Sequence, residues 1–208
     1  MICLFDNDII YKLAACDLLD DALVALGLTK PDVYALPTAK YKFGTTRKGS
    51  ARGERRYGAE VLTRIRDFLG NIRELDVSGS PEELQLLASV DGIDVGETIL
   101  FSATSQFDQY LLATGDKTSL RALVLTPVCR PVAQRIRGHV ICLEQIIKHL
   151  IQHFGFPYVK DKLVPARACD TVLSIVFNSE HNALEPDVFA ALDSYINELR
   201  SLPIDLLI

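Results

Sequence analysis

Apolar residues in this chain occur either as short continuous runs or as longer stretches with helical spacing. Continuous runs predict buried strands at residues 2–5, 33–36, 110–113 and 140–143. Helical spacing predicts helices over residues 8–27, 59–75, 80–90, 94–106, 117–123 and 144–154. Because strands and helices follow one another in turn, we expect an α/β fold with a central parallel sheet and helices on both faces.

The pattern changes near Gly155. Residues 158–208 show no further alternation of strands and helices, and they predict helices around 166–178 and 186–200. We therefore divide the chain into an α/β domain at residues 1–154 and a helical C-terminal extension at residues 155–208. We expect this extension to pack on the domain, and to offer a surface for a protein partner or a second copy of the chain.

Composition limits the classes of function. The chain has 208 residues and a net charge of −5, so contact with nucleic acid requires a local basic patch. Five scattered cysteines without a CxxC pair indicate free thiols in a reducing compartment. No basic segment precedes the first apolar run, and no apolar stretch approaches the roughly 20 residues that span a bilayer. We expect a cytoplasmic protein without membrane contact.

Three acidic motifs stand at corresponding places in the predicted sheet. Phe5-Asp6-Asn7-Asp8 and Thr114-Gly115-Asp116-Lys117 follow predicted strands, and Asp94-Val95-Gly96-Glu97 opens a predicted helix. Carboxylates at the C-terminal ends of neighbouring parallel strands converge on one crevice, where open sheets bind ligands. Such carboxylates repel one another unless a cation neutralises them, and their oxygens suit Mg²⁺ or Mn²⁺.

Each acid also has a local explanation. Asp6 suits the N-cap of the following helix, and Asp8 suits its first turn. Asp94 and Glu97 form a normal capping arrangement, and Asp116 suits a turn. The order of the motifs and their shared edge of the sheet favour a joint metal site over these separate roles.

A basic stretch lies between residues 40 and 58, with Tyr41, Phe43 and Tyr57 interleaved. Cationic side chains neutralise phosphates and aromatic rings stack on unpaired bases, so we expect this stretch to contact nucleic acid. Its four glycines predict a flexible loop that orders on binding. A solvated, mobile loop without a ligand is the alternative. The predicted nucleic-acid-binding residues are Lys40, Lys42, Arg47, Lys48, Arg52, Arg55 and Arg56.

The order and spacing of these motifs resemble the PIN domain nucleases over about residues 1–154. The segments that carry the resemblance are Leu4 to Leu13, Gly96-Glu97 with Ser102-Ala103, Leu111 to Lys117, and Gly138 to Glu144. The resemblance implies a three-layer α/β/α sandwich and an Mg²⁺- or Mn²⁺-dependent endoribonuclease, with RNA favoured over DNA. By the same resemblance Asp6, Glu97 and Asp116 are the catalytic metal-binding acids, Asp8 and Asp94 are further candidate ligands, and Thr114 supports Asp116.

One departure leaves two alternatives open. The family usually carries a further acid on the helix after the second strand, whereas the matching stretch here, Leu36 to Phe43, has Lys40 and Lys42. Asp8 or Asp94 would have to replace that acid in a working nuclease. The first alternative is a PIN-like module that no longer cleaves and serves in binding or assembly. The second is a haloacid-type phosphatase, in which Asp6 of the Asp6-x-Asp8 pair would form an aspartyl-phosphate.

Overall fold

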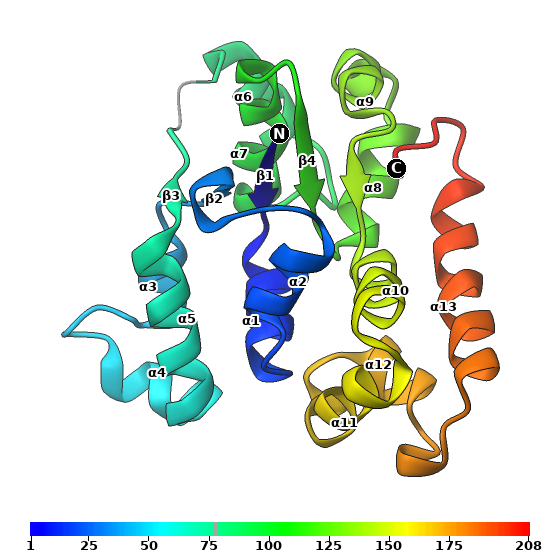
Figure 1. The fold of residues 1–208 in the computed structure, drawn as a ribbon. Coiled ribbons are helices and arrows are strands. Elements are labelled where there is room, and N and C mark those ends of the chain that lie inside the picture. The colour runs from blue at the N-terminus through cyan, green and yellow to red at the C-terminus, as the bar shows by residue number, and fades with distance from the viewer. Residues whose placement is uncertain (77–78) are drawn as a thin grey trace.

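Five parallel strands form the centre of the molecule in a computed structural model that describes residues 1–76 and 79–208 (Figure 1). The strands are β1 (Ile2–Phe5), β2 (Val33–Ala35), β3 (Arg73–Glu74), β4 (Tyr110–Ala113) and β5 (Val140–Ile141), in the order β3-β2-β1-β4-β5. The predicted α/β class with a central parallel sheet is confirmed. β3 falls within the helix expected over residues 59–75, which ends at Asn71. This part of the prediction is wrong because β3 is a two-residue exposed edge strand whose polar residues give no apolar run.

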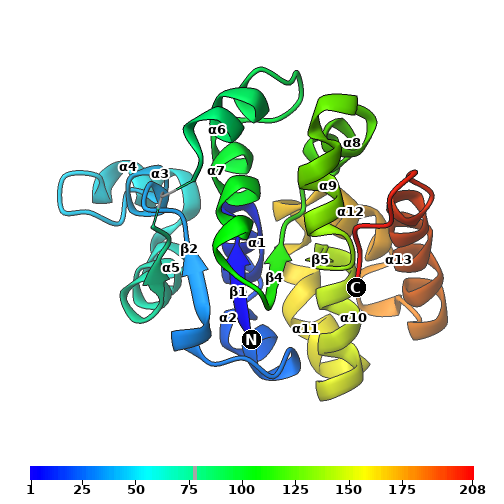
Figure 2. The same ribbon diagram turned by 90° about the horizontal axis from the view of Figure 1, so that it is seen from above.

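Residues of β1, β2, β4 and β5 point alternately to two apolar clusters on opposite faces of the sheet. In β1, Cys3 and Phe5 join one cluster, and Leu4 joins the other. The first face is covered mainly by α1 (Asn7–Ala15), α2 (Leu19–Ala25), α5 (Ala59–Asn71), α10 (Leu143–Phe154), α11 (Phe156–Ala166) and α12 (Thr171–Val176). The second face is covered by α6 (Pro81–Ala88), α7 (Val95–Ala103), α8 (Lys117–Leu125) and α9 (Arg130–Ile136), as the view from above shows (Figure 2).

A predicted helix and a predicted loop also differ from the structure. The helix expected over residues 8–27 is broken into α1 and α2, because Asp17 adopts a left-handed conformation with φ of 55°. Aspartate tolerates this conformation better than most residues, so the apolar pattern continues while the backbone turns. The expected flexible loop at residues 40–58 instead contains two short helices, α3 (Ala39–Phe43) and α4 (Ser50–Tyr57).

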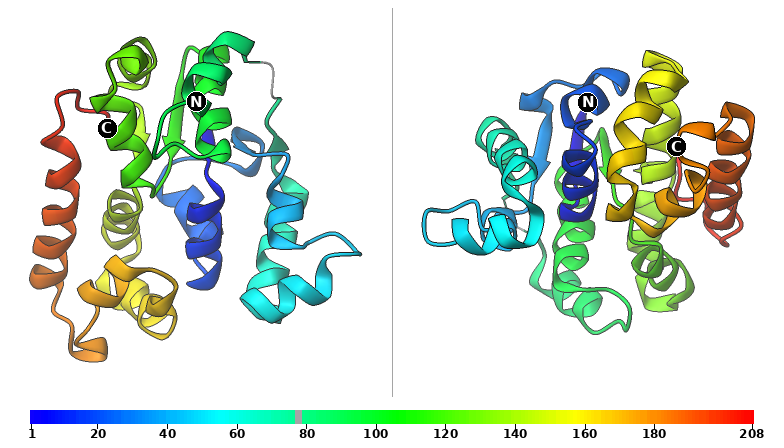
Figure 3. Two further views of the ribbon diagram at one scale, coloured as in Figure 1. Left: turned by 180° about the vertical axis from the view of Figure 1, so that it is seen from behind. Right: turned by 90° about the horizontal axis from the view of Figure 1, so that it is seen from below.

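The C-terminal segment lies along β5 and across the first face of the sheet (Figure 3). Its α11 has Pro157 in the first turn, where the missing N–H of proline costs nothing. The domain boundary expected near Gly155 is therefore a short turn between α10 and α11. The long α13 (Glu185–Arg200) contributes residues to both apolar clusters. Leu207 then forms a parallel bridge with Val140, which places the end of the segment beside β5.

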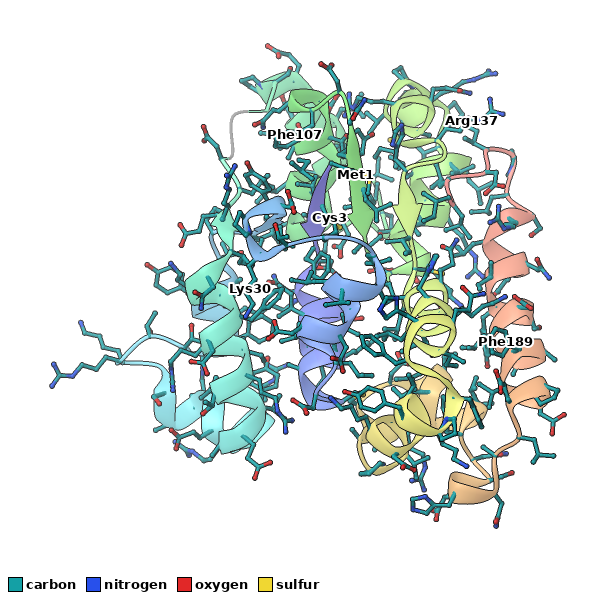
Figure 4. The ribbon with its side chains drawn as sticks, viewed as in Figure 1. Met1, Cys3, Lys30, Phe107, Arg137 and Phe189 are labelled. Atoms are coloured by element: carbon teal, nitrogen blue, oxygen red, sulfur yellow. The ribbon has the colours of Figure 1, made fainter. Side chains whose placement is uncertain are left out.

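Side chains fill the space between the sheet and the helices (Figure 4). Cys3 lies inside the core on β1, and Phe189 lies on α13 at the side of the molecule. No helix within the two described ranges combines the length and the apolar character needed to cross a bilayer.

Candidate active site at the strand ends

The strand order reverses between β1 and β4, and an acidic crevice opens at the C-terminal ends of these strands. Open α/β sheets bind ligands at such a switch point. Asp6 follows β1 directly, and Asp116 lies three residues after the last residue of β4. The crevice has a volume of about 480 Å³. Its charged lining residues are Asp6, Asp8, Asp94, Glu97, Asp116, Glu144 and Asp170, together with Lys12, Lys42 and Lys117.

Asp6 is a buried carboxyl group that does not act as a helix cap. It occupies the N-cap position of α1, yet its side chain makes no capping hydrogen bond, and the residue is only 3% exposed. Burial raises the pKa of Asp6 to about 6, repulsion from Asp8 adds to the rise, and Lys42 opposes it. The carboxyl group is therefore directed to the crevice at an electrostatic cost.

Glu97 is the most perturbed acid of the crevice. It lies in the first turn of α7, is 5% exposed, and its Oε2 has no hydrogen-bond partner. Burial raises the pKa of Glu97 to about 9, with further increases from a hydrogen bond to Asp94 and from repulsion by Asp6 and Asp94. Glu97 therefore holds a proton at neutral pH.

Asp94 orients the start of α7. Its Oδ1 accepts hydrogen bonds from the backbone N–H groups of Gly96, at 2.6 Å, and Glu97, at 3.0 Å. The hydrogen bond with the Glu97 side chain lowers the pKa of Asp94, so the two carboxyl groups share one proton and Asp94 is the charged member. The capping role expected for Asp94 is present, and the same side chain lines the crevice.

Asp116 is fixed by its backbone surroundings. Its Oδ1 accepts hydrogen bonds from the N–H groups of Thr118, at 2.9 Å, and Ser119, at 3.0 Å, as the N-cap of α8. Both bonds use Oδ1, so Oδ2 is not committed to the cap. The buried Thr114 accepts a hydrogen bond from the Asp116 N–H through its Oγ1, at 3.2 Å, which holds the turn after β4.

Two lysines form ion pairs with the other three acids. Nζ of Lys12 lies 2.5 Å from Asp8 and 2.6 Å from Asp170, and Nζ of Lys117 lies 2.9 Å from Glu144. Asp8 is therefore already paired with a cation. This makes it a weaker substitute for the acid that the resemblance to PIN domains predicts after the second strand. The sequence did not single out Glu144 or Asp170 as site residues.

Glu144 and Asp170 differ in whether a pattern in the sequence marks them as site residues. Glu144 lies three residues after the last residue of β5, so it meets the same strand-end criterion as Asp116. Asp170 comes from the C-terminal segment, where it caps α12 by accepting a hydrogen bond from the Leu173 N–H at 2.8 Å. No local pattern links Asp170 to residues more than 150 positions earlier, so its place in the crevice required the structure.

The residues of the basic stretch divide between the crevice and the surface. Lys42 lines the crevice, whereas Lys40 is ion-paired with Glu74. Arg52 donates a hydrogen bond to the Tyr41 carbonyl at 3.0 Å, Arg55 donates to the Ala51 carbonyl at 3.3 Å, and the Arg56 guanidinium lies 5.3 Å from the centre of the Tyr57 ring. Arg47 and Lys48 lie in the connection between α3 and α4.

The crevice offers suitable donors for a divalent cation without a preassembled cage. Within residues 1–76 and 79–208, no three His, Cys, Asp or Glu side chains are arranged to hold a metal ion. The donors themselves fit Mg²⁺ or Mn²⁺, because they are carboxylate oxygens and one of them, Oε2 of Glu97, is buried without a partner. Binding would require Glu97 to lose its proton and the side chains of Asp6, Glu97 and Asp116 to converge.

No protein-family model matches this chain, and no curated protein or solved structure is significantly similar to it, so its function is inferred from the fold and the crevice.

Proposed function

We propose that this protein is an Mg²⁺- or Mn²⁺-dependent nuclease that hydrolyses phosphodiester bonds in RNA. The observation that carries the proposal is the buried side chain of Glu97 in the crevice, where burial, the hydrogen bond to Asp94 and repulsion by Asp6 raise its pKa to about 9. The charged form of Glu97 is therefore unfavourable in the empty crevice, and a divalent cation would stabilise it. The position of the crevice at the switch point between β1 and β4 supports the same proposal.

The residues have separate roles in this proposal. Asp6, Glu97 and Asp116 would hold the metal ion, and Asp94, which is hydrogen-bonded to Glu97, would orient the Glu97 side chain. A bound Mg²⁺ or Mn²⁺ supplies an acidic water molecule and positive charge at the phosphate. Lys42 adds positive charge beside Asp6, and the basic residues of α3 and α4 orient the strand.

A second candidate function is a PIN-like binding module that does not cleave. The observation that favours it is the set of lysines in the crevice: Lys12 and Lys117 form ion pairs with Asp8, Asp170 and Glu144 within the protein itself. These pairs offset part of the negative charge, so the crevice needs less help from a metal ion. The two functions differ in their response to Mn²⁺, which makes them separable.

The test is cleavage of an end-labelled single-stranded RNA with Mn²⁺ by the wild type, Asp6→Asn and Asp116→Asn. Asparagine is also a good N-cap, so Asp116→Asn removes charge while α8 keeps its start. We expect both variants to lose at least about 100-fold in rate. The control is Asp20→Asn, because the Asp20 side chain is 70% exposed and paired with Lys30 outside the crevice.

Two outcomes would contradict the nuclease. One is a wild type that cleaves no RNA with Mn²⁺, and the other is an Asp6→Asn variant that cleaves as fast as the wild type. RNA binding without Mn²⁺-dependent cleavage, together with no Mn²⁺ binding that depends on Asp6, would support the non-cleaving module.

A further inference from the structure

A small hollow lies beside α3, separate from the acidic crevice. It has a volume of about 290 Å³ and is lined by Tyr41, Thr46, Lys48, Gly49 and Arg52. The lining supplies one aromatic ring, two hydroxyl groups and two cations, and it contains no carboxylate. This combination suits a ligand that is flat at one end and anionic at the other.

Close backbone contacts hold the hollow in shape. Gly44 has φ of +69°, and a Cβ atom at this position would lie 2.6 Å from the carbonyl oxygen of Gly49. A Cβ atom at Gly49 would lie 2.8 Å from the Cα atom of Gly44. Only glycine at both positions allows the two ends of the α3–α4 connection to approach so closely. Arg52 further ties α4 to α3 through its hydrogen bond to the Tyr41 carbonyl.

The Tyr41 ring is not used by the core. The residue is 69% exposed, whereas Phe43, two positions later in the same helix, is fully buried. Tyr57, the other tyrosine of the basic stretch, packs its ring against Tyr11 and Phe43. Tyr41 therefore presents a large aromatic face to solvent beside two cations.

The hollow and the crevice meet at one helix. Tyr41 lines the hollow and the next residue, Lys42, lines the crevice. Successive residues of an α-helix point about 100° apart, so α3 forms the ridge between the two sites. A flexible phosphodiester chain that crosses this ridge can occupy both.

We propose that the hollow is a nucleotide subsite, in which an unpaired base stacks on Tyr41 and the adjoining phosphate lies against Lys48 and Arg52. This inference rests on the proposed nuclease and specifies its substrate as single-stranded nucleic acid that extends beyond the cleaved phosphate. A base inside a duplex is already stacked and paired, so its face is not available to Tyr41.

The experiment measures binding of a fluorescein-labelled 12-nucleotide single strand by anisotropy, with EDTA present so that no cleavage occurs. RNA and DNA strands of one sequence, and the corresponding duplexes, are compared for the wild type, Tyr41→Ala and Tyr41→Phe. We expect Tyr41→Ala to weaken binding of single strands roughly 5- to 100-fold, which is the range for loss of one stacked base. Tyr41→Phe keeps the ring and should bind like the wild type, and duplexes should bind more weakly than single strands.

Two further variants control for charge and for tyrosine loss. Tyr158→Ala removes another partly exposed tyrosine, on α11, and should leave binding unchanged. Lys48→Ala should reduce the slope of log affinity against log salt by about one, because one phosphate contact is lost. Unchanged thermal unfolding of Tyr41→Ala would confirm that the variant folds.

Several results would overturn the subsite: no binding of single strands by the wild type below roughly 100 μM, equal affinity of Tyr41→Ala and the wild type, or equal affinity for duplexes. The subsite and the nuclease can fail separately. Cleavage with Mn²⁺ by a protein whose binding ignores Tyr41 would remove the subsite and keep the nuclease. Tyr41-dependent binding without cleavage would remove the nuclease and keep the subsite.

Discussion

Two acidic regions of this molecule are stabilised in opposite ways. At the turn between α1 and α2, Asp17 is paired with Arg64 at 3.0 Å, Asp21 with Lys162 at 3.0 Å, and Asp20 with Lys30, which is labelled in Figure 4. In the crevice, Asp6 and Glu97 are more deeply buried, and in the described part of the chain neither takes part in an ion pair.

The difference shows that the number of acids is a poor guide to function. Both regions line hollows in the surface, and both contain several aspartates. Only the crevice combines burial, mutual repulsion and an unpartnered oxygen, and only there does the pKa of a carboxyl group rise to about 6 or about 9. In the empty protein the buried Glu97 is stabilised by a proton, whereas the acids of the other region are stabilised by lysine and arginine side chains.

The largest expected effect is on Mn²⁺ affinity. We expect one site by calorimetry, with affinity lowered about 100-fold by Glu97→Gln and unchanged by Asp21→Asn in the paired region. Because the pKa of Glu97 is about 9, binding at pH 7.5 should release about one proton, and affinity should rise about tenfold from pH 7 to 8 and less steeply towards pH 9. Equal effects of the two substitutions would remove the contrast between the regions.

A smaller effect is expected on the stability of the metal-free protein. The folded state raises the pKa of Asp6 from 3.8 to about 6 and that of Glu97 from 4.5 to about 9, so it binds these protons more tightly than the unfolded chain. The resulting contribution to stability is present at low pH and is lost as pH rises through 6 and then 9.

Urea unfolding from pH 5 to 9 should therefore show Glu97→Gln gaining stability relative to the wild type as pH rises. On the order of 1–3 kcal/mol of this difference is expected at pH 9. Mn²⁺ should stabilise the wild type more than the variant. Parallel stability curves for the two proteins over this pH range would show that ionisation of Glu97 does not destabilise the folded protein.

The smallest expected effect is in the paired region. Burial opposes the charge on Lys162, but hydrogen bonds with Tyr158, Asp21 and Asp17 outweigh it and raise the lysine pKa. Lys162→Ala should cost about 1 kcal/mol of unfolding free energy, less at high salt, without changing Mn²⁺ affinity. Lys30→Ala, which breaks a more exposed pair, should cost less, and a loss of Mn²⁺ binding in either variant would contradict the separation of the regions.

Sequence patterns predicted the parts of the fold that depend on local apolar runs. The strands at residues 2–5 and 110–113 agree residue for residue with β1 and β4, because both are buried on two faces and read as continuous apolar runs. The break at Asp17 was missed because it depends on one backbone conformation. α11 was missed because the domain boundary was expected near Gly155 and no helix was predicted before residue 166.

The sequence predicted a site residue only where that residue closely follows a strand or lies at the start of a helix. Asp6, Glu97 and Asp116 meet that condition, and all three line the crevice. Ion pairs with Lys12 and Lys117 depend on the tertiary fold, and the arrival of Asp170 depends on packing of the C-terminal segment. The basic stretch was expected to be a flexible loop, because its glycines hid two short helices and serve instead as tight contacts between α3 and α4.

Lys12 connects the C-terminal segment to the crevice through an ion pair. Its side chain is only 12% exposed and is held between Asp8, in the first turn of α1, and Asp170, from the opposite end of the sequence. A chain shortened at Gly155 would lose Asp170 and leave Lys12 held by Asp8 alone. One of the two acids that fix a lysine of the crevice therefore comes from the extension and not from residues 1–154.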